Sequence, residues 1–493
     1  MSVKDDARIT GKIIYIGNLL LETPLLISAG DKGNAADEVL LKDESGYPFI
    51  PATSIIGAMR HFMNYYGPIE LKNNLVYEYF WGSPKGIDQN SKQSALYLRD
   101  LPMVHKDLDN YVIRIRDGVA IDNKYGIAAD KKKFEYEVLE PGVSFQLYME
   151  ITLREAYNEK EHVKAQVEYL LRALSNGNIR LGAKTTRGLG KCRLTAIQYM
   201  DLDFNNENEV FKWLNKDQDY QVWVPPPTDF KNDYIKYNFS IKAEFAIKHS
   251  ILVRSYSGNP EEPDTVHISR GGKPVLAGTS LAGAIRARAE KIANTFMVNN
   301  SSNILIRPLF GWADEQLKDG VKYKSRLLIE ETLIDPDVIA REKQTRIKID
   351  RFTGGALKKH LFEELPLWPR EETNDDTKVV CIDLSIRNCE DYEAGLLLLI
   401  LKDLWDGDLA IGGGKNIGRG ILRGIEAEIF LNDEVIRIDY LECDTLEKNQ
   451  CFQRRLMVQN KQTGNSAYHL LQQKVDAFHA YCKQSKEMIS GDQ

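Results

Sequence analysis

The sequence lacks the residue patterns of disulfide scaffolds, zinc sites and membrane spans. Its six cysteines are scattered at positions 192, 381, 389, 443, 451 and 482, with no CxxC pair and no zinc spacing. We therefore expect free or buried thiols in a reducing compartment. No apolar run approaches the roughly 18 residues of a membrane helix, and the opening MSVKDDAR has no signal-peptide core. These absences predict a cytoplasmic protein without a membrane partner.

The chain also lacks the excess of positive charge that drives indiscriminate nucleic-acid binding. Its net charge is −6, and its 493 residues are enough for two or three domains with separate cores. The charge is uneven, because residues 201–209 and 371–376 are acidic whereas residues 131–133 are all lysine. This distribution still allows a specific basic groove.

The sequence does contain one pattern twice. The segment GYPFIPATSIIGAMR at 46–60 returns 226 positions later as GKPVLAGTSLAGAIR, with seven identical positions. VAID at 119–122 is repeated as IKID at 347–350, and LGAKTTRGLG at 181–190 is repeated as IGGGKNIGRG at 411–420. Three motifs in the same order indicate a tandem duplication. A site in one copy therefore predicts a counterpart in the other.

Each copy alternates strand and helix patterns in the same order. In the first copy, residues 8–21 alternate as a strand, a helix follows Pro51, a second helix covers 162–175, and 191–199 form a closing strand. The second copy has strand patterns at 237–245 and 421–430 and a helix pattern at 393–405. We predict an α+β fold with two tandem ferredoxin-like (RRM-like, split βαβ) domains that carry inserted hairpins.

The predicted domains are 7–202 and 237–431. An acidic connector that contains consecutive prolines (203–236) joins them, and a C-terminal extension (432–493) follows. The extension has no partner in the first half of the chain. Its last part, residues 468–488, has the pattern of an amphipathic helix, which we expect to dock on a neighbouring protein.

Both glycine-rich loops and both helix starts combine small residues with cations. Glycine lets backbone N–H groups approach a phosphate, and basic side chains neutralise it. The alternatives are a tight helix-to-strand connection and a helix, capped by Thr53 or Ser54, that packs its glycine on a sheet. A nucleotide-binding P-loop is disfavoured, because the lysine of 177–185 comes one residue late and the second copy has no equivalent. The predicted phosphate contacts are Ser54, Arg60, Lys184, Arg187, Ser280, Arg286, Arg288, Lys415 and Arg419.

The helix-start motif and the late basic loop together resemble the RAMP superfamily (repeat-associated mysterious proteins), above all the backbone subunits of type III CRISPR effector complexes. Phe310-Gly311, SRL at 325–327 and IDRFTGGA at 349–356 resemble the same subunits. The first copy departs from the pattern at IDNKYG (121–126), and Trp81 interrupts its Phe-Gly pair. The resemblance covers nearly all of 7–431, twice, and implies two fused backbone units, as in type III-D.

In that family an Asp upstream of the helix start is associated with metal-dependent cleavage of target RNA. The matching positions are Asp37 and Asp264, 14 and 13 residues before Pro51 and Ala277. A carboxylate near a phosphodiester can hold a divalent cation and favour in-line attack by the neighbouring 2′-hydroxyl. The resemblance thus implies Mg²⁺ or Mn²⁺ at Asp37 and Asp264. The alternative for each is a loop Asp that caps or is solvated, and Asp31 competes with Asp37.

No histidine is shared between the copies. His61 aligns with Ala287, and His267 aligns roughly with Leu40. A site retained by duplication would have its general base in both copies, so metal-free histidine catalysis is disfavoured.

The resemblance implies a two-unit backbone protein of a type III CRISPR ribonucleoprotein in antiviral defence. Such a protein binds guide RNA through its phosphates, cleaves complementary target RNA, assembles with other RAMP-family subunits and makes no direct DNA contact. Hydrophobic hairpins in the inserts would wedge between bases. Two alternatives remain open: a non-catalytic RNA-binding scaffold of the same complex, and a metal-independent guide-processing endoribonuclease.

Overall fold

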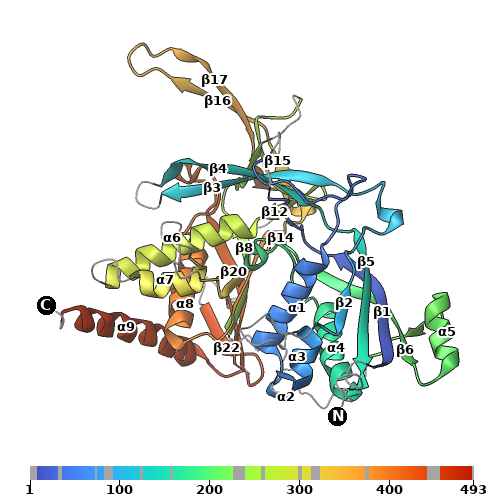
Figure 1. Cartoon of the computed structure of the whole chain (residues 1–493). Coiled ribbons are helices and arrows are strands. Elements are labelled where there is room, and N and C mark those ends of the chain that lie inside the picture. Colours follow the sequence, from blue (N-terminus) through green and yellow to red (C-terminus); the bar gives the residue numbers. More distant parts are fainter. Residues whose placement is uncertain are drawn as a thin grey trace. The chain divides into compact units, whose positions relative to one another are not determined.

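The chain forms two compact units. The computed structural model describes residues 8–30, 36–72, 75–82, 93–122, 126–155, 159–225, 239–256, 261–297, 302–312, 323–371, 377–432, 434–440 and 456–490. Unit 1 comprises residues 1–115, 135–185 and 189–235, and unit 2 comprises 116–134, 186–188 and 236–493. Two short pieces of the first repeat therefore belong to unit 2. Figure 1 labels the elements along the chain.

Unit 1 is built on a five-stranded antiparallel sheet in the order β2-β5-β1-β6-β7. Its central strand, β1, pairs with β5 on one side and with β6 on the other. This is the strand order of a split βαβ, ferredoxin-like fold, so the predicted fold class is confirmed. The strands are β1 (Ile9–Leu21), β2 (Leu96–Leu98), β5 (Ser144–Arg154), β6 (Cys192–Asp203) and β7 (Gln221–Val222).

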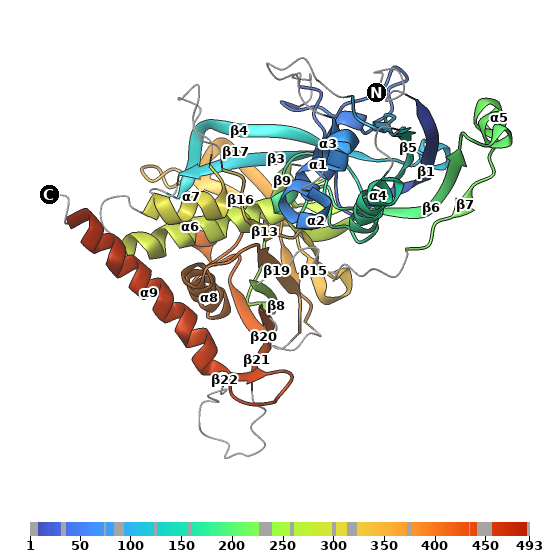
Figure 2. The same ribbon diagram turned by 60° about the horizontal axis from the view of Figure 1, so that its bottom comes forward.

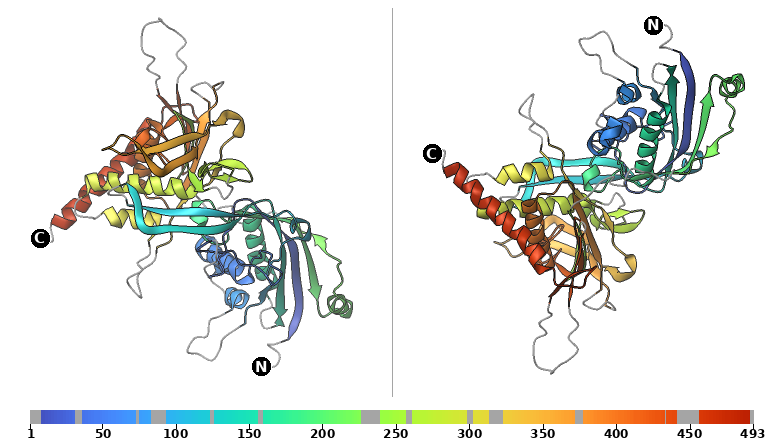
Figure 3. Two further views of the ribbon diagram at one scale, coloured as in Figure 1. Left: turned by 90° about the horizontal axis from the view of Figure 1, so that it is seen from above. Right: turned by 90° about the horizontal axis from the view of Figure 1, so that it is seen from below.

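Helices cover both faces of the unit 1 sheet. Figure 3 shows α1 (Ala52–Tyr66), α2 (Ile69–Lys72), α3 (Leu75–Trp81) and α4 (Lys160–Ser175) on one face. The other face carries α5 (Glu207–Asn215), whose Trp213 packs against Phe204 while the Lys12 ammonium lies 4.5 Å from the Trp213 ring centroid. The predicted connector thus contains a helix that packs on the sheet.

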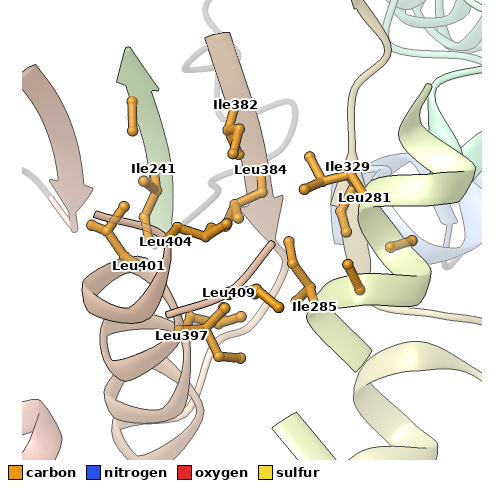
Figure 4. Packing of buried hydrophobic residues seen from close by; sticks show 14 of the residues in the cluster. Ile241, Leu281, Ile285, Ile329, Ile382, Leu384, Leu397, Leu401, Leu404 and Leu409 are labelled. Carbon is orange, nitrogen blue, oxygen red and sulfur yellow. The ribbon is translucent and has the colours of Figure 1, made fainter. Parts of the chain in front are cut away.

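Unit 2 repeats the same topology and extends it. Its sheet has the order β13-β19-β8-β20-β21-β22, with β8 between β19 and β20. In Figure 4, leucines of α8 and Ile285 of α6 converge on side chains of β8 and β19. The elements are β8 (Phe239–Ile247), α6 (Gly278–Phe296), β13 (Leu327–Ile329), β19 (Val380–Ile386), α8 (Asp391–Trp405), β20 (Leu422–Leu431), β21 (Glu434–Tyr440) and β22 (Leu456–Asn460).

Shorter elements connect these cores. One more helix, α7, spans Ser302–Phe310, and the 3₁₀ turns include η3 and η5 in the two glycine-rich loops. The remaining bounds are β9 (Arg254–Tyr256), β10 (Thr265–His267), β11 (Ser269–Arg270), β12 (Lys273–Leu276), β14 (Thr332–Leu333), β15 (Ile339–Arg341), β18 (Leu367–Pro369), η1 (His105–Asp107), η3 (Thr185–Arg187), η4 (Pro336–Val338) and η5 (Lys415–Ile417).

Each repeat carries an inserted β-hairpin, as predicted. The first is formed by β3 (Ile113–Asp122) and β4 (Ile127–Leu139), the second by β16 (Gln344–Ile349) and β17 (Ala356–Leu365). Figure 1 shows the second hairpin projecting from the body of unit 2. Its exposed apolar side chains are Ile347, Ile349, Phe352, Leu361 and Phe362.

A buried ion pair fastens the distal part of the first hairpin within unit 2. Arg116 donates from both terminal nitrogens to Glu331, with Nη1–Oε2 at 2.5 Å and Nη2–Oε1 at 3.2 Å. Arg270 Nη1 lies 3.4 Å from the same Oε1. The Arg116 and Glu331 side chains are 3% and 1% exposed, so loss of either partner would leave a buried charge at a cost of about 3–5 kcal/mol.

The C-terminal helix α9 (Tyr468–Ser490) packs against α8, and Figure 2 shows it beside that helix. Phe478 and Cys482 are buried in the unit 2 core, and Tyr481 stacks on Tyr392 at 4.1 Å. The prediction that this helix docks on a neighbouring protein is therefore wrong for its apolar face. The chain's own α8 covers that face.

The first helix is capped differently from the prediction. Pro51 is the N-cap of α1, and the Ala52 N–H donates to Asp100 Oδ1 at 2.7 Å. Thr53 and Ser54 lie within the first turn, so the prediction that one of them is the N-cap is wrong. Pro51 has no oxygen on its side chain, and a carboxylate distant in sequence satisfies the first helical amide instead.

The composition predicted free thiols and no membrane-spanning helix. None of the four described cysteines forms a disulfide, in line with the predicted thiols, while Cys443 and Cys451 lie outside the described residues. Among the described helices, none combines the length and apolar character needed to cross a bilayer.

A glycine in α8 sets how closely α9 approaches. A Cβ added at Gly395 would lie 2.1 Å from the carbonyl oxygen of Lys474, so we expect Gly395→Ala to separate α9 from α8 and cost about 1–3 kcal/mol. The matched control is Gly283→Ala in α6, which would meet no described atom within 4 Å and should stabilise the helix by about 1 kcal/mol. Amide hydrogen exchange of α9 measures the difference. Equal protection of α9 in the two variants would contradict this packing.

Candidate functional site

The glycine-rich loop has the same internal geometry in both copies. A Cβ at Gly190 would lie 1.9 Å from the carbonyl oxygen of Leu181, and a Cβ at Gly420 would lie 1.9 Å from that of Ile411. Each of these pairs is joined by a backbone hydrogen bond of 2.9 Å. The glycines thus make the tight helix-to-strand connection possible, which was the alternative to a phosphate contact in the sequence analysis. The hydrogen bond within each loop also fixes the positions of its side chains.

The cations of the two loops have different environments. Lys184 has a φ of 56°, and its ammonium lies 3.9 Å from the ring centroid of the buried Tyr136. Lys415 is exposed at the start of η5. Arg419 is only 3% exposed, and its Nη1 donates to Glu364 at 2.7 Å. The structure thus places Arg419, a predicted RNA contact, inside unit 2 with its charge paired, and we leave it out of the proposed RNA interface.

The helix-start glycines are exposed in both copies. Neither Gly57 nor Gly283 has a described atom within 4 Å of where a Cβ would lie. The alternative in which this glycine packs on a sheet is therefore wrong. An exposed helical glycine costs about 1 kcal/mol relative to alanine. Close approach of a bound molecule's backbone would explain why both copies have one.

The polar residues of the helix starts lie beside these glycines. Ser54 and Ser280 are half-buried in the first turn of α1 and α6. Arg60 is exposed and hydrogen-bonds the Tyr77 hydroxyl. The structure thus leaves Arg60 at the surface of α1, where a phosphate could compete for it.

The two arginines of α6 differ in their surroundings. Arg288 Nε donates to Asp403 of α8 at 2.5 Å, and both side chains are largely buried. Because this pair holds α6 to α8, we leave Arg288 out of the proposed RNA interface. Arg286 instead pairs with Glu290 at 3.0 Å and donates from Nη1 to the Gly311 carbonyl at 3.4 Å, which places it at the edge of a groove.

That groove has a volume of about 670 Å³ and combines cations with aromatic rings. The Arg307 guanidinium stacks 3.9 Å from the Trp312 ring centroid, and Trp312 and Tyr323 exchange two backbone hydrogen bonds. No carboxylate lines the groove among the described residues. Cation-rich walls with aromatic faces suit a phosphodiester backbone with unstacked bases. The lining residues, all of unit 2, are Thr186, Arg187, Arg286, Phe310, Gly311, Trp312, Tyr323, Lys324 and Ser325.

The surroundings of Lys324 in the groove disfavour its positive charge. Burial lowers the pKa of its ammonium, and the neighbouring positive charge of Arg387 lowers it further. The protonated form is therefore less stable than that of an exposed lysine. A bound anion would oppose both effects, because its negative charge stabilises the protonated form.

Asp37 and Asp264 occupy the same place in the two copies. Asp37 Oδ2 accepts the backbone N–H of Glu135 at 3.0 Å, and Asp264 Oδ2 accepts that of Glu363, also at 3.0 Å. The residue after each Asp forms a parallel bridge with the hairpin strand, Glu38 with Tyr136 and Thr265 with Glu364. Both carboxylates are exposed at the root of an inserted hairpin. The competing Asp31 lies outside the described residues.

The surroundings of these two positions differ. Glu364 is buried at the root of the second hairpin, where it pairs with Arg254, Arg346 and Arg419 at 3.0, 3.2 and 2.7 Å. Three guanidinium groups around one carboxylate leave a net positive charge near Asp264. The aligned residue of the first copy is Tyr136, under the Lys184 ammonium. Both hairpin roots therefore place cations close to the candidate aspartate. The second root uses the arginines around Glu364, and the first uses Lys184.

A divalent cation would have few protein ligands at either position. No group of three or more His, Cys, Asp or Glu side chains suited to a metal occurs among the described residues. Mg²⁺ is commonly held by one or two carboxylates together with substrate phosphates and water. Single exposed carboxylates at Asp37 and Asp264 fit that arrangement, and they do not fit a closed protein-only site.

His267 is part of the fold. It is 7% exposed, its Nδ1 accepts the Val253 N–H at 3.2 Å, and its Nε2 lies 2.9 Å from the Val275 carbonyl oxygen. Burial lowers the pKa of His267 to about 4. Both ring nitrogens are engaged by the backbone, which does not suit a general base acting on RNA.

Sequence comparison of the two copies misaligned the aromatic-glycine turn that contains Phe310-Gly311 in the second copy. Ser325 Oγ donates to the carbonyls of Leu309 and Leu327, and Ser94 Oγ donates to those of Phe80 and Leu96. The first-copy equivalent of Phe310-Gly311 is therefore Trp81-Gly82, and the prediction that Trp81 interrupts the pair is wrong. Gly82 and Gly311 both have a positive φ, 74° and 83°. In the sequence, the aromatic residue directly before each of these glycines already indicates the same equivalence.

Lys324 and Trp312 were missed as groove residues. They follow the Phe-Gly turn, and only the backbone pairing of Trp312 with Tyr323 brings them together.

Comparison with known families gives one match. A family model described as the RAMP superfamily matches residues 18–193 and 244–423, which together make up more than half of the chain. The two matched segments lie within the two repeats, 7–202 and 237–431. No curated protein matches the chain.

The groove predicts how anion binding depends on pH. Replacing Lys324 by Ala should weaken binding of single-stranded RNA roughly tenfold at neutral pH, because one charge-assisted contact is lost. The pKa of Lys324 is lowered, so this lysine loses its proton at a lower pH than an exposed one. The difference between wild type and K324A should therefore shrink as pH rises, in titrations with 2′-O-methyl RNA.

The control for this titration is Lys402→Ala, which removes an exposed lysine paired with Asp406 on α8. It should leave RNA affinity unchanged at every pH. A wild-type advantage over K324A that stays constant or grows with pH would contradict the assignment of Lys324 to the anion site.

Proposed function

Because the chain belongs to the RAMP superfamily, we propose that it is a backbone subunit of a type III CRISPR ribonucleoprotein that binds guide RNA and cleaves complementary target RNA. Family membership supports the coarser part of this function, an RNA-binding CRISPR-associated protein that assembles with other subunits. Cleavage, the type III assignment and the III-D-like fusion are the further steps. The observations below support cleavage, the two matched segments within one chain support the fusion, and the type III assignment rests on the sequence resemblance.

Guide binding is supported by the groove of unit 2. Its cations Arg187, Arg286 and Lys324 face a space bordered by aromatic rings, with no acidic lining among the described residues. Contacts of this kind neutralise phosphates and stack bases without reading their identity. The guide would therefore be held alike for all spacer sequences, and base pairing with the target would supply specificity.

Target cleavage is supported by the one arrangement that both copies share, a carboxylate at the root of a projecting hairpin. Asp37 and Asp264 each accept a backbone N–H from that root at 3.0 Å. In cleavage the 2′-hydroxyl oxygen bonds to the adjacent phosphorus, the bond from phosphorus to the 5′ oxygen breaks, and the proton lost at O2′ is balanced by one gained at O5′. The products are a 2′,3′-cyclic phosphate and a 5′-hydroxyl.

The carboxylates would act in this reaction through their charge and their fixed position. A divalent cation, Mg²⁺ or Mn²⁺, bound at Asp37 and Asp264 would neutralise the charge that develops on the phosphate. The hydrogen bond to the hairpin root keeps each carboxylate from turning away. Near Asp264, cations of the same unit such as Arg254 and Arg346 would hold the neighbouring phosphate.

The hairpins would give the geometry that in-line attack needs. Phe352 is fully exposed, and Ile347 and Ile349 are more than half exposed on the same hairpin. Apolar side chains of this kind can enter a base stack and separate two adjacent nucleotides. A separated step lets the 2′-hydroxyl align with the scissile phosphate, close to the carboxylate at the root.

Two other functions are consistent with the same fold. A non-catalytic scaffold would use the groove and the hairpins but would not need a charge at Asp37 or Asp264. A metal-independent guide-processing ribonuclease would need a general base, and the buried, backbone-bonded His267 does not suit that role. The charge on the two aspartates therefore distinguishes the first alternative from the proposed function.

Asparagine substitutions separate charge from structure at these positions. In Asp37→Asn the side-chain oxygen can still accept the Glu135 N–H, while the negative charge is lost. We expect D37N to abolish one cut in a guide-paired target, by 100-fold or more in rate, and to leave the second cut and guide binding intact. D264N should remove the other cut. Single-turnover assays with end-labelled target in Mg²⁺ measure both positions.

The matched control is Asp100→Asn, which also keeps a hydrogen-bond acceptor for a backbone amide, here that of Ala52. It should leave both cuts unchanged. If D37N and D264N cleave like the wild type, the scaffold function is favoured and the proposed catalysis is excluded.

A further inference from the structure

The connector between the two repeats has three exposed apolar side chains. Phe211 and Leu214 of α5 are both 58% exposed, and Val222 of β7 is 71% exposed. Phe211 and Leu214 are three residues apart on the helix, so their side chains are neighbours on its surface. Figure 2 shows α5 close to β6 and β7, at the edge of the unit 1 sheet. We call these three residues the connector surface.

The inner side of the connector is fixed on the sheet of unit 1. Trp213 of α5 and Tyr220, the residue before β7, both pack on a small buried cluster of β1 and β6 side chains that includes Met200. Val222 pairs with Gln198, which is two residues from Met200 on β6, so their side chains lie on one face of the sheet. The connector surface therefore belongs to the side of the sheet that α5 covers, and packing from below holds it in place.

The same face of unit 2 is polar. In each unit the central strand pairs with the closing strand across one register shift, which aligns the two sheets with each other. The cross-strand pair Ile14–Met200 of unit 1 then corresponds to Lys242–Glu428 of unit 2, where Glu428 also pairs with Lys461 at 2.6 Å. The fold itself therefore does not require apolar side chains on this face, and they are a property of the first copy and its connector.

The charge of the connector is strongly negative. Residues 201–219 contain six acidic residues and two lysines. Two lysines of α4 pair with Asp201, and Lys212 pairs with Asp219 at 2.8 Å, which leaves four carboxylates and Lys216. Such a segment repels the phosphates of a nucleic acid. It is complementary to a protein surface that has lysine or arginine around an apolar centre.

We propose that the connector surface docks another protein through an amphipathic helix, whose apolar stripe covers Phe211, Leu214 and Val222 and whose flanking lysines or arginines face the carboxylates of the connector. A helix of this kind binds through apolar anchors three and four residues apart, and its charges set the association rate and the choice of partner. The inference goes beyond the proposed function, because none of these residues lines the groove of unit 2 or bonds to either candidate aspartate.

Cross-linking in the assembled complex identifies what covers the connector surface. The photoreactive residue p-benzoylphenylalanine replaces Phe211 in the full chain, co-expressed with guide RNA and its partner subunits, and mass spectrometry identifies the cross-linked peptide. We expect one protein partner, linked through a helix that has lysine or arginine beside an apolar stripe. The control places the same residue at Tyr468, which is 61% exposed in unit 2 and should not give this product.

Every other cross-linking result overturns the proposal. A product with RNA would show that the acidic charge does not exclude a nucleic acid. A product with a second copy of this chain would make the surface a contact between copies. A partner segment without basic residues, or no product from position 211, would equally contradict the proposed docking.

Binding measurements with the purified partner then separate apolar from charged contacts. The double variant Phe211→Ser, Leu214→Ser should weaken binding at least tenfold, and because both side chains are exposed it should fold normally. Glu207→Gln with Asp217→Asn should slow association severalfold and flatten its salt dependence. Tyr468→Ser is the control and should change neither quantity. Wild-type affinity in the double serine variant would overturn the proposal, whatever the result of the cleavage assays.

Discussion

The hydrogen bond between an aspartate and the root of a hairpin ties the chemistry of this chain to its fold. In both copies a carboxylate oxygen accepts a backbone N–H from the descending hairpin strand, and the next residue bridges to the same strand. This bond fixes a negative charge at a set distance from an apolar, projecting hairpin. A target strand that met the hairpin would meet the carboxylate with it. In the proposed function, base separation and target cleavage both depend on that spacing.

The two copies preserve this geometry while their surroundings have diverged. At the second root, a buried Glu364 gathers Arg254, Arg346 and Arg419; at the first, Lys184 lies over Tyr136. Duplicated domains are free to change wherever the same charge can be supplied in another way. The elements that both copies share include the glycines of the loop and the two aspartates.

Much of the fold could be predicted from the sequence, because the repeat and the strand and helix periodicities are local signals. The equivalence of Asp37 and Asp264 was also predictable, since their spacing to the helix start is nearly constant. The role of Arg419 was not, because its partner Glu364 is 55 residues away and glycine neighbours suggested exposure. The docking of α9 on α8 depends on Gly395, whose missing side chain leaves no pattern in the sequence.

The most direct test is a density map of the chain bound to guide RNA and a non-cleavable target. The account predicts guide phosphates along the groove of Arg187, Arg286 and Lys324, and a target phosphate beside each of Asp37 and Asp264, with a hairpin separating the adjacent bases. A map in which the target backbone passes far from both carboxylates would contradict it.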